Sequence, residues 1–424
     1  MSAADRFPGV DTIDDRVEIS LTSSGVRVVS DPVPDARSAS ISIWIGAGSR
    51  DEPSAMAGAC HFLEHLIFQG TERRGAHEVN VAIDAVGGDL NAYTAKETTA
   101  FFAQVPAADV GMAAELLCEM VNTPRLDPDD VETERDVILE ELAMVNDTPD
   151  ELAMTLLVDR LFSDHGLGWE TLGREETLKS MSRDDLAGFH QRWYNPANIV
   201  VAAAGAVIHD DVLAIVDRGL SERAPVRPTR VVPAPVESGA MTMQRETEQV
   251  HLAYGWRGLE HQHPDRFALT LLLHTLGQGP SSRLYRVVRD ELGLAYSVFS
   301  SHSMFSDTGL ISIYCATNPA NLDQVRTVID SQLSDIIGNG ITDEELRISA
   351  GYVCGSAVMA LEDHGTKMSR LGSALINRGE IEPVRTSLDA FGAVTLDDIV
   401  RVAECVLGVE PITVAVGPVD PAGF

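Results

Sequence analysis

The sequence predicts an α+β protein made of two homologous layered domains, each a mainly antiparallel sheet packed with helices. Two observations support this prediction. Strand-like segments with alternating apolar residues are followed by groups of helical segments, and this order occurs twice along the 424 residues. A proline-rich stretch lies between the two occurrences. A hydrophobic content of 44% supplies enough apolar side chains for two complete cores.

The first half begins with two alternating segments, residues 17–31 and 38–49, which are typical of half-buried strands. Helical patterns, a strand pair with a short turn, and two long helical patterns follow. These segments are predicted as helices at Ala57–Gln69 and His77–Val86, strands at Asp89–Thr94 and Thr99–Pro106, and helices at Asp109–Asn122 and Asp127–Val145. Short turns between neighbouring strands favour antiparallel pairing.

The second half repeats this order, which indicates a duplication of about 200 residues. It is predicted to contain strands at 239–246 and 249–258, helices at Arg266–Leu276 and Ser282–Leu292, strands at 295–304 and 308–317, and helices that begin at Asn321, Thr342 and Asp363.

The clearest boundary is the stretch 222–238, ERAPVRPTRVVPAPVES, which holds four prolines. Proline fixes φ and removes a backbone donor, so such a run resists both helix and sheet. We therefore predict an N-terminal domain over 1–222, a linker over 223–238 and a C-terminal domain of the same fold over 239–424.

The chain is strongly acidic, with 64 Asp and Glu against 32 Lys and Arg, a formal net charge of −32. Nucleic acids and anionic membranes bind clustered Lys and Arg, so neither is an expected partner. The charge would attract basic peptides by electrostatic steering, or it serves only solubility.

The cysteine pattern and the N-terminus favour a cytoplasmic protein. Five scattered cysteines without a CxxC pair argue against a disulfide framework and a thiolate zinc site. The N-terminus lacks a signal-peptide pattern, and no run of 18 apolar residues predicts a membrane span. The first dozen or so residues are expected to form a loose tail.

The segment ACHFLEHLIFQGT carries the residues that point to chemistry. His61 and His65 are four residues apart, so on a helix they differ by about 40° in azimuth and both imidazoles reach one metal ion. Glu64 lies about 60° to the other side of His61, within reach of the same pocket. The alternative is a pair of core histidines bonded to backbone carbonyls, with Glu64 in an ion pair.

Two histidines leave a catalytic zinc site incomplete, because such sites use three protein ligands and a water. The helix TERDVILEELAMVNDTPDE is the best source of a third ligand. Glu134 and Glu141 are seven residues apart and share one face of that helix. Glu132 and Glu140 are better explained as solvated surface residues.

These motifs resemble the pitrilysin/insulinase family of inverzincin zinc metallopeptidases. The chain most resembles the family's short-chain branch, which includes the mitochondrial processing peptidase catalytic subunit and its bacterial relatives. The resemblance covers nearly the whole chain. It is carried by HFLEH, FQGT, NAYT with KETT, ERDVILEEL followed by DTP, and SSRLYRVVRDELGLAYSV. It implies one half of a clamshell-shaped metalloprotease.

The resemblance assigns a role to each residue of the zinc site. It implies one Zn²⁺ per chain, held by His61, His65 and Glu141, the last lying 76 residues after His65. Glu134 is the residue that orients a ligand histidine. Glu64 is the general base that activates water for attack on the peptide bond.

The resemblance also implies how a peptide binds. Asn91, Ala92, Tyr93 and Thr94 form an edge strand that pairs with an extended substrate by β-augmentation. Phe68 is included among the expected substrate contacts. The alternative for these residues is an ordinary edge strand.

The second half contains no HxxEH, so it resembles the family's inactive domain. Its Arg289 and Tyr296 match a pair that relatives bring to the substrate, and both suit oxyanion stabilisation. The alternative is a surface arginine and a core tyrosine.

In relatives of this size two chains enclose a chamber, so the Arg/Tyr pair faces the zinc of the other chain. A homodimer is therefore expected, and a heterodimer with a non-catalytic homologue is the alternative. The stretch LGQGPSSRLY is shorter than the glycine-rich loop of the processing peptidase, so recognition of presequences is not expected.

Together these expectations describe a zinc-dependent endopeptidase or oligopeptidase that cleaves extended, basic peptides inside a closed dimer. The competing hypothesis is a non-catalytic scaffold or assembly subunit of the same fold.

Overall fold

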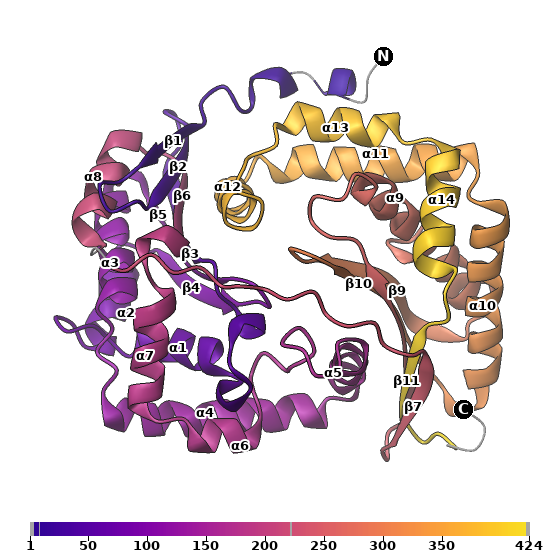
Figure 1. Cartoon of the computed structure of the whole chain (residues 1–424). Helices are drawn as coiled ribbons and strands as arrows, with labels where there is room; N and C mark the ends of the chain where they lie inside the picture. Colours follow the sequence, from indigo (N-terminus) through magenta and orange to yellow (C-terminus); the bar gives the residue numbers. More distant parts are fainter. Residues whose placement is uncertain (1–3, 8, 221–222, 421–424) are drawn as a thin grey trace.

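Two mixed sheets, each with helices on its faces, form the molecule in a computed structural model that describes residues 4–7, 9–220 and 223–420 (Figure 1). The first sheet has the order β1-β2-β6-β3-β5-β4 and the second the order β7-β11-β8-β10-β9. The first comprises β1 (Glu18–Leu21), β2 (Arg27–Pro32), β3 (Ser38–Ile45), β4 (Asp89–Thr94), β5 (Thr99–Pro106) and β6 (Ile199–Gly205). The second comprises β7 (Gly239–Gln244), β8 (Val250–Gly258), β9 (Ala295–Met304), β10 (Gly309–Thr317) and β11 (Ile412–Gly417).

The two sheets share one topology. From β2 and from β7 onward the strands follow the same order, and each sheet has a single parallel pair at the same place, β2 with β6 and β7 with β11. All the other neighbouring strands are antiparallel. The predicted α+β class with two mainly antiparallel sheets is confirmed.

Helices make up much of both halves. The first half has α1 (Ala59–Phe68), α2 (Ala76–Asp84), α3 (Val110–Asn122), α4 (Pro128–Asp147), α5 (Pro149–Leu161), α6 (Glu175–Ser180), α7 (Arg183–Trp193) and α8 (His209–Gly219). The second half has α9 (Arg266–Gly277), a π-helical segment (Tyr285–Glu291), α10 (Leu322–Asn339), α11 (Asp343–Ala360), α12 (His364–Asn377), α13 (Val384–Ala393) and α14 (Leu396–Leu407). Among the described residues, none of the helices has the length and apolar character needed to cross a membrane.

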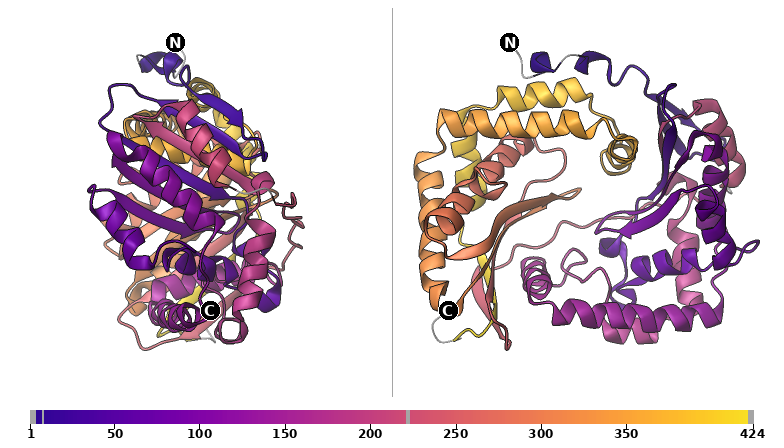
Figure 2. Two further views of the ribbon diagram at one scale, coloured as in Figure 1. Left: turned by 90° about the vertical axis from the view of Figure 1, so that its left-hand side faces the viewer. Right: turned by 180° about the vertical axis from the view of Figure 1, so that it is seen from behind.

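Two helices are exchanged between the halves. Helix α5, from the first half, packs on β8 and β11 of the second sheet, and α12 packs on β2, β3 and β6 of the first sheet (Figures 1 and 2). Leu157 of α5 shares a core with Ala253 of β8, and Leu371 of α12 shares a core with Trp44 of β3. Each sheet is therefore completed by a helix from the other half of the chain.

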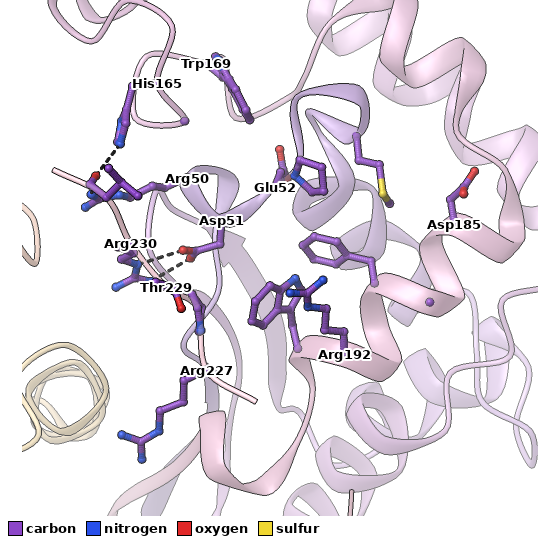
Figure 3. Close-up of a pocket in the computed structure, with 18 of the residues that line it drawn as sticks. Arg50, Asp51, Glu52, His165, Trp169, Asp185, Arg192, Arg227, Thr229 and Arg230 are labelled. Carbon is purple, nitrogen blue, oxygen red and sulfur yellow. Dashed lines mark hydrogen bonds and ion pairs between the residues drawn. The ribbon is translucent and has the colours of Figure 1, made fainter. Parts of the chain in front are cut away.

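The linker region is extended and carries no helix or strand over its described residues, 223–238. Residues 221 and 222, where the first predicted domain ends, lie outside the described residues. Arg230 of the linker donates to Asp51 Oδ1 and Oδ2 at 3.0 and 2.9 Å (Figure 3). Arg50 donates to the carbonyl of Val231 at 2.8 Å. Charged contacts thus fix the path of the linker.

The sequence analysis did not place β6 and β11. Their sequences, IVVAAAG and ITVAVG, are short continuous apolar runs with no period-two alternation. Such runs are typical of strands buried on both faces, but periodicity alone does not separate them from buried helix.

The expectation of a loose N-terminal tail is wrong for the described residues. Val10 is buried in a small core with Val384 and Leu388. Arg385 of α13 also forms an ion pair with Asp5 at 3.1 Å. Burial of apolar surface and ion pairing order this segment against the second half of the chain.

Candidate metal centre

Helix α1 presents two different faces. Phe62, Leu63, Leu66 and Ile67 are buried in the core of the first half, which satisfies the apolar stripe of the helix. His61, Glu64 and His65 are half-buried on the opposite side. The core therefore holds the helix rigidly while its polar residues remain accessible.

A buried carboxylate caps the start of α1. Glu52 accepts hydrogen bonds from the backbone N–H groups of Gly58 and Cys60, both at 2.7 Å. The first N–H groups of a helix have no partner within the helix, so this carboxylate satisfies two of them. Complete burial raises the pKa of Glu52 to about 8. The cap sets where the helix with the metal-binding histidines begins.

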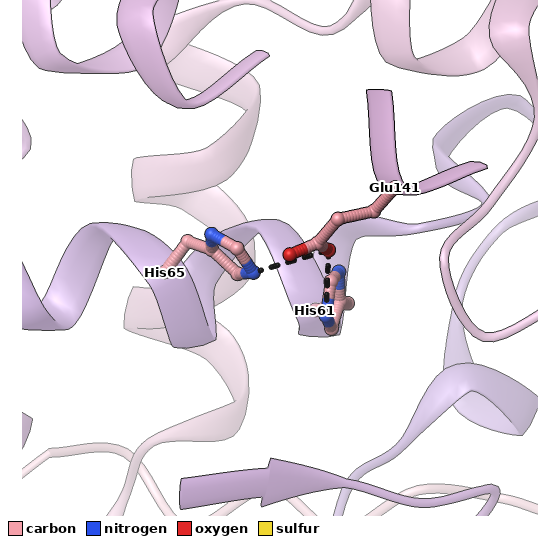
Figure 4. A group of neighbouring side chains, drawn as sticks. All are labelled: His61, His65 and Glu141. Atoms are coloured by element: carbon pink, nitrogen blue, oxygen red, sulfur yellow. Dashed lines mark ion pairs between the residues drawn. The ribbon is translucent and has the colours of Figure 1, made fainter. Parts of the chain in front are cut away.

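Three side chains converge, and they are the three that the resemblance implies as zinc ligands. Glu141 Oε2 lies 3.8 Å from His61 Nε2 and 3.6 Å from His65 Nε2 (Figure 4). One ligand atom from each residue lies within 4.8 Å of the other two. Helix α1 supplies the histidines and α4 supplies the glutamate, so helix packing alone brings the group together.

This group fits a zinc ion. The distances of 3.6 and 3.8 Å are too long for hydrogen bonds. Ligand atoms of a tetrahedral zinc site lie about 3.3 Å apart, given metal–ligand bonds of about 2.0–2.2 Å, which is close to the spacing found here. Two imidazole nitrogens and a carboxylate oxygen are also a donor set that zinc accepts, with one position left for water.

The protonation of His61 suits the same role. Burial, with a smaller contribution from His65, lowers the pKa of His61 to about 4. The ring is therefore neutral at pH 7, which is the form of histidine that binds metals.

Glu134 orients the second histidine. Its Oε2 lies 2.8 Å from His65 Nδ1, and its Oε1 accepts a hydrogen bond of 2.6 Å from Gln69 Nε2. Because Nδ1 is engaged by this buried carboxylate, Nε2 of His65 is directed toward Glu141. Glu134 and Glu141 lie on one face of α4, as their spacing predicted.

Glu64 stands beside the three-residue group and is held from the other side. Thr94 of β4 donates its hydroxyl to Glu64 Oε2 at 2.5 Å. Burial raises the pKa of Glu64, while the Thr94 hydrogen bond and the charge of His65 oppose that rise. A carboxylate in this position is able to accept a proton from a water bound between it and the ligand group.

A cavity of about 540 Å³ opens beside these residues. His61 and Glu64 line it together with Ala92, Tyr93 and Thr94 of the edge strand β4. Further lining comes from α5 and the loop that follows it, including the acidic residues Glu151 and Glu170. The cavity is thus bounded by one strand edge and carries excess negative charge.

Two residues predicted to contact substrate lie apart from this cavity. Phe68 packs against Phe101, with ring centroids 6.4 Å apart, at the edge of the core. The side chain of Asn91 is exposed, and its Oδ1 accepts a hydrogen bond of 2.8 Å from the N–H of Ala92. Neither side chain lines the cavity.

Arg289, on the π-helical segment, and Tyr296, on β9, contact each other in the second half of the chain. The Arg289 guanidinium sits 4.2 Å from the ring centroid of Tyr296 and 4.6 Å from that of Tyr285. Tyr296 is 76% exposed, so it is not a core tyrosine. Neither residue of the pair lines the cavity.

Four residues that the sequence analysis did not single out contribute to the centre: Glu52, Gln69, Glu151 and Glu170. Glu52 acts through backbone N–H groups, and Glu151 and Glu170 reach the cavity from a separate helix and loop. The contact between Gln69 and Glu134 joins α1 to α4. None of these residues carries a local spacing signal.

Comparisons with known proteins agree with this geometry. Residues 27–175 match the insulinase family, peptidase family M16, and residues 180–349 match the peptidase M16 inactive domain. The chain is 40% identical over 401 residues to an uncharacterized zinc protease of Mycobacterium leprae, covering 93% of this chain and 90% of the relative. It is 38% identical over 403 residues to an uncharacterized zinc protease of Streptomyces coelicolor, covering 93% and 88%.

A solved structure has the same fold. The crystal structure of a protease from Helicobacter pylori has a TM-score of 0.89 at 23% identity, covering 95% of this chain and 99% of that one. The similarity therefore extends over both sheets.

Proposed function

The chain belongs to the insulinase family of metallopeptidases, peptidase family M16, and we propose that it cleaves extended, basic peptides with Glu64 as the general base. Its relatives are named zinc proteases, which supports zinc as the metal of this chain. One zinc ion per chain would be held by His61, His65 and Glu141. These residues form the one group of three potential metal ligands found among the described residues.

The contacts support separate roles for the zinc ion and for Glu64. When bound, zinc supplies Lewis acidity, which acidifies water and polarises a carbonyl oxygen. Thr94 holds Glu64 Oε2, so Glu64 Oε1 is available to take a proton from the attacking water. Glu64 then delivers this proton to the amine nitrogen that leaves when the peptide bond breaks.

The edge strand and the acidic lining support the proposed substrate class. Strand β4 has a neighbour on one side, β5, so its other side offers backbone groups to an extended peptide. Glu151 and Glu170 line the same cavity and favour positively charged side chains over negative ones. Asn91 and Phe68 are proposed as weaker, outlying contacts.

The separation of Arg289 and Tyr296 from the cavity supports a two-chain active site. Arg289 is half-buried, contacts the rings of Tyr285 and Tyr296 and donates one hydrogen bond, of 3.3 Å, to the carbonyl of Tyr296. It is therefore a preorganised donor that does not line the cavity of its own chain. A second copy of the chain would bring this pair to the zinc site. Since each chain carries both parts, a homodimer is sufficient.

The cysteines support a cytoplasmic location. All five are free, and four of them are buried. Proteins of oxidising compartments commonly use cysteines in disulfides, whereas reduced thiols are typical of the cytosol.

The approach of Glu141 to both histidines is the observation that carries the proposal, and replacement of Glu64 tests it. We expect Glu64→Gln to lower hydrolysis of an unstructured basic peptide at least about 100-fold, because the base is removed. Bound zinc and thermal stability should stay unchanged. The matched control is Glu140→Gln, an exposed neighbour of the ligand on α4. Wild-type hydrolysis by Glu64→Gln, measured by mass spectrometry beside metal analysis, would refute the mechanism.

A further inference from the structure

Four arginines line a smaller cavity that shares no lining residue with the cavity at the metal centre. Arg27 comes from β2, Arg227 and Arg230 from the linker, and Arg378 from the residue after α12. The cavity has a volume of about 280 Å³, and none of the described residues that line it is acidic. We call it the arginine cavity. It lies where the first sheet, the linker and a helix from the second half meet.

Three of these arginines have no carboxylate partner. Arg230 is neutralised by Asp51 and Glu97. Arg27, Arg227 and Arg378, in contrast, form no ion pair with any described carboxylate within 4.0 Å. Arg227 is exposed, and Arg27 and Arg378 are half-buried. The fully buried arginines Arg50, Arg135 and Arg283, by comparison, each have a carboxylate partner. The charge of the three arginines without a carboxylate partner is therefore available to a ligand.

The arginines also affect one another. Burial lowers the pKa of Arg27, and the positive charge of Arg227 lowers it further. Burial likewise lowers the pKa of Arg378, against the attraction of Glu382 and Glu380, which do not line the cavity. Positive charges held together in this way are stabilised by a bound anion.

Some of the guanidinium donors in the arginine cavity bind backbone carbonyls of the protein itself. Arg27 Nη1 donates to the carbonyl of Leu375 at 2.8 Å, in the last turn of α12, where the helix dipole favours a positive charge. Arg227 uses its Nε to reach the carbonyl of Ala197 at 2.9 Å. In Figure 3 the rest of the Arg227 side chain projects away from Arg230 and Asp51. Each guanidinium has five N–H donors, so most donors of Arg227 and Arg378 remain for a ligand.

We propose that the arginine cavity binds a phosphate group, either inorganic phosphate or a small phosphate ester. A phosphate carries about −1.5 to −2 charges at pH 7 and has several acceptor oxygens, which suits three unpaired guanidiniums better than a single carboxylate does. The cavity accommodates a phosphate with a short organic group. Because its walls come from both halves and the linker, the bound ligand fastens the two halves together.

Thermal unfolding of the zinc-loaded enzyme tests this proposal. Inorganic phosphate and glycerol 3-phosphate are titrated separately at constant ionic strength, and the midpoint Tm is recorded. A ligand that binds the native state raises Tm in a saturable way. Stronger stabilisation by glycerol 3-phosphate identifies an ester as the occupant, and stronger stabilisation by inorganic phosphate identifies the free ion.

Substitutions of the arginines test whether phosphate binds in the arginine cavity. Arg227→Gln and Arg378→Gln should each weaken phosphate binding at least about tenfold, by calorimetric titration, because one charge-assisted contact is lost. Arg347→Gln removes an exposed arginine on α11 outside the cavity and should bind as the wild type does. The proposal is overturned if Tm does not rise in a saturable way, or if both cavity variants bind phosphate with wild-type affinity.

Discussion

At the scale of single residues, two buried carboxylates organise the metal centre without lying among the three ligand atoms. Glu134 holds the ring of His65, and Glu52 holds the N-terminus of α1. A buried carboxylate is costly unless it is hydrogen-bonded, and each of these two accepts a pair of contacts on its two oxygens. Replacement of Glu134 is therefore expected to change zinc affinity, whereas replacement of Glu52 is expected to change how stability depends on pH.

Replacement of Glu134 should weaken the metal site. We expect Glu134→Gln to lower zinc affinity about 10–100-fold, because the amide no longer fixes His65 through a charged hydrogen bond. Competition with a chelator of known affinity measures the change. Glu140→Gln is the control, and equal affinities of the two variants would show that Glu134 does not orient the ligand.

Glu52 should make stability depend on pH in an unusual direction. Its pKa is about 8 in the folded protein, against an ordinary value of 4.5. Between these values the folded state binds a proton that the unfolded state lacks, so this residue's contribution to stability falls as pH rises. Urea unfolding at pH 5, 6.5 and 8 should show the wild type losing stability relative to Glu52→Gln. Parallel pH curves for both proteins would contradict this assignment.

At the scale of elements, the exchanged helices depend on glycine at their points of contact. Gly372 of α12 lies against the indole of Trp44, where an added Cβ would be 2.0 Å from Nε1. Gly255 of β8 makes a similar approach to Leu157 of α5, at 2.8 Å. Close approach without a side chain lets each helix pack flat on the sheet of the other half.

Addition of one methyl group at Gly372 should therefore be harmful. We expect Gly372→Ala to lower the free energy of unfolding by about 1–3 kcal/mol, because Trp44 is buried and has no room to move. The control is Gly355→Ala on α11, where nothing lies within 4 Å. That change should raise stability by up to about 1 kcal/mol through helix propensity. Denaturant unfolding measures the free energy of unfolding of both variants. Equal changes in the two would contradict the packing argument.

At the scale of the whole molecule, Arg50 links three parts of the chain. Its guanidinium donates to Glu97 at 2.5 Å, to Asp307 at 2.6 and 2.8 Å, and to the carbonyl of Val231 at 2.8 Å. These partners lie in the turn between β4 and β5, in the turn between β9 and β10, and in the linker. One buried cation thus holds the two halves and the linker in a fixed arrangement.

Loss of the contact across the halves should destabilise the molecule. We expect Asp307→Asn to cost about 1–3 kcal/mol, less than a fully broken buried pair because Arg50 keeps Glu97. Asp184→Asn, which alters an exposed pair with Arg183, should change stability by less than about 0.5 kcal/mol. Urea unfolding of the two variants tests the difference, and an unchanged midpoint for Asp307→Asn would argue against a link between the halves.

The proposed two-chain active site predicts complementation. Glu64→Gln and Arg289→Gln are each expected to be nearly inactive as homodimers. After unfolding and refolding of an equal mixture, half of the dimers pair one variant with the other, and each of these has one intact site. Peptidase activity should therefore return to about a quarter of the wild-type value. If the mixture shows no more than the summed residual activities, Arg289 does not serve the zinc site of a partner.

The amino-acid sequence was sufficient to predict the local features of this protein. Strand alternation, helical spacing and the repeated order of elements depend on near neighbours, so they predicted the fold class and most of β3–β5 and β8–β10. The placement of Glu64 on the same side of the helix as His61 and His65 follows from helix geometry alone. The resemblance to known peptidases added Glu141 and Glu134, and the packing of α1 against α4 agrees with both.

The contacts between segments that are distant in the sequence become visible in the folded structure alone. Strands β6 and β11 enter the middle of sheets whose other strands are far away in sequence, and α5 and α12 pack on the opposite half. Glu52, Arg50 and the arginine cavity depend on the same long-range packing. These contacts form between apolar surfaces and charged groups that meet after folding. Local spacing of residues does not indicate which distant segment will pack against a given strand, helix or side chain.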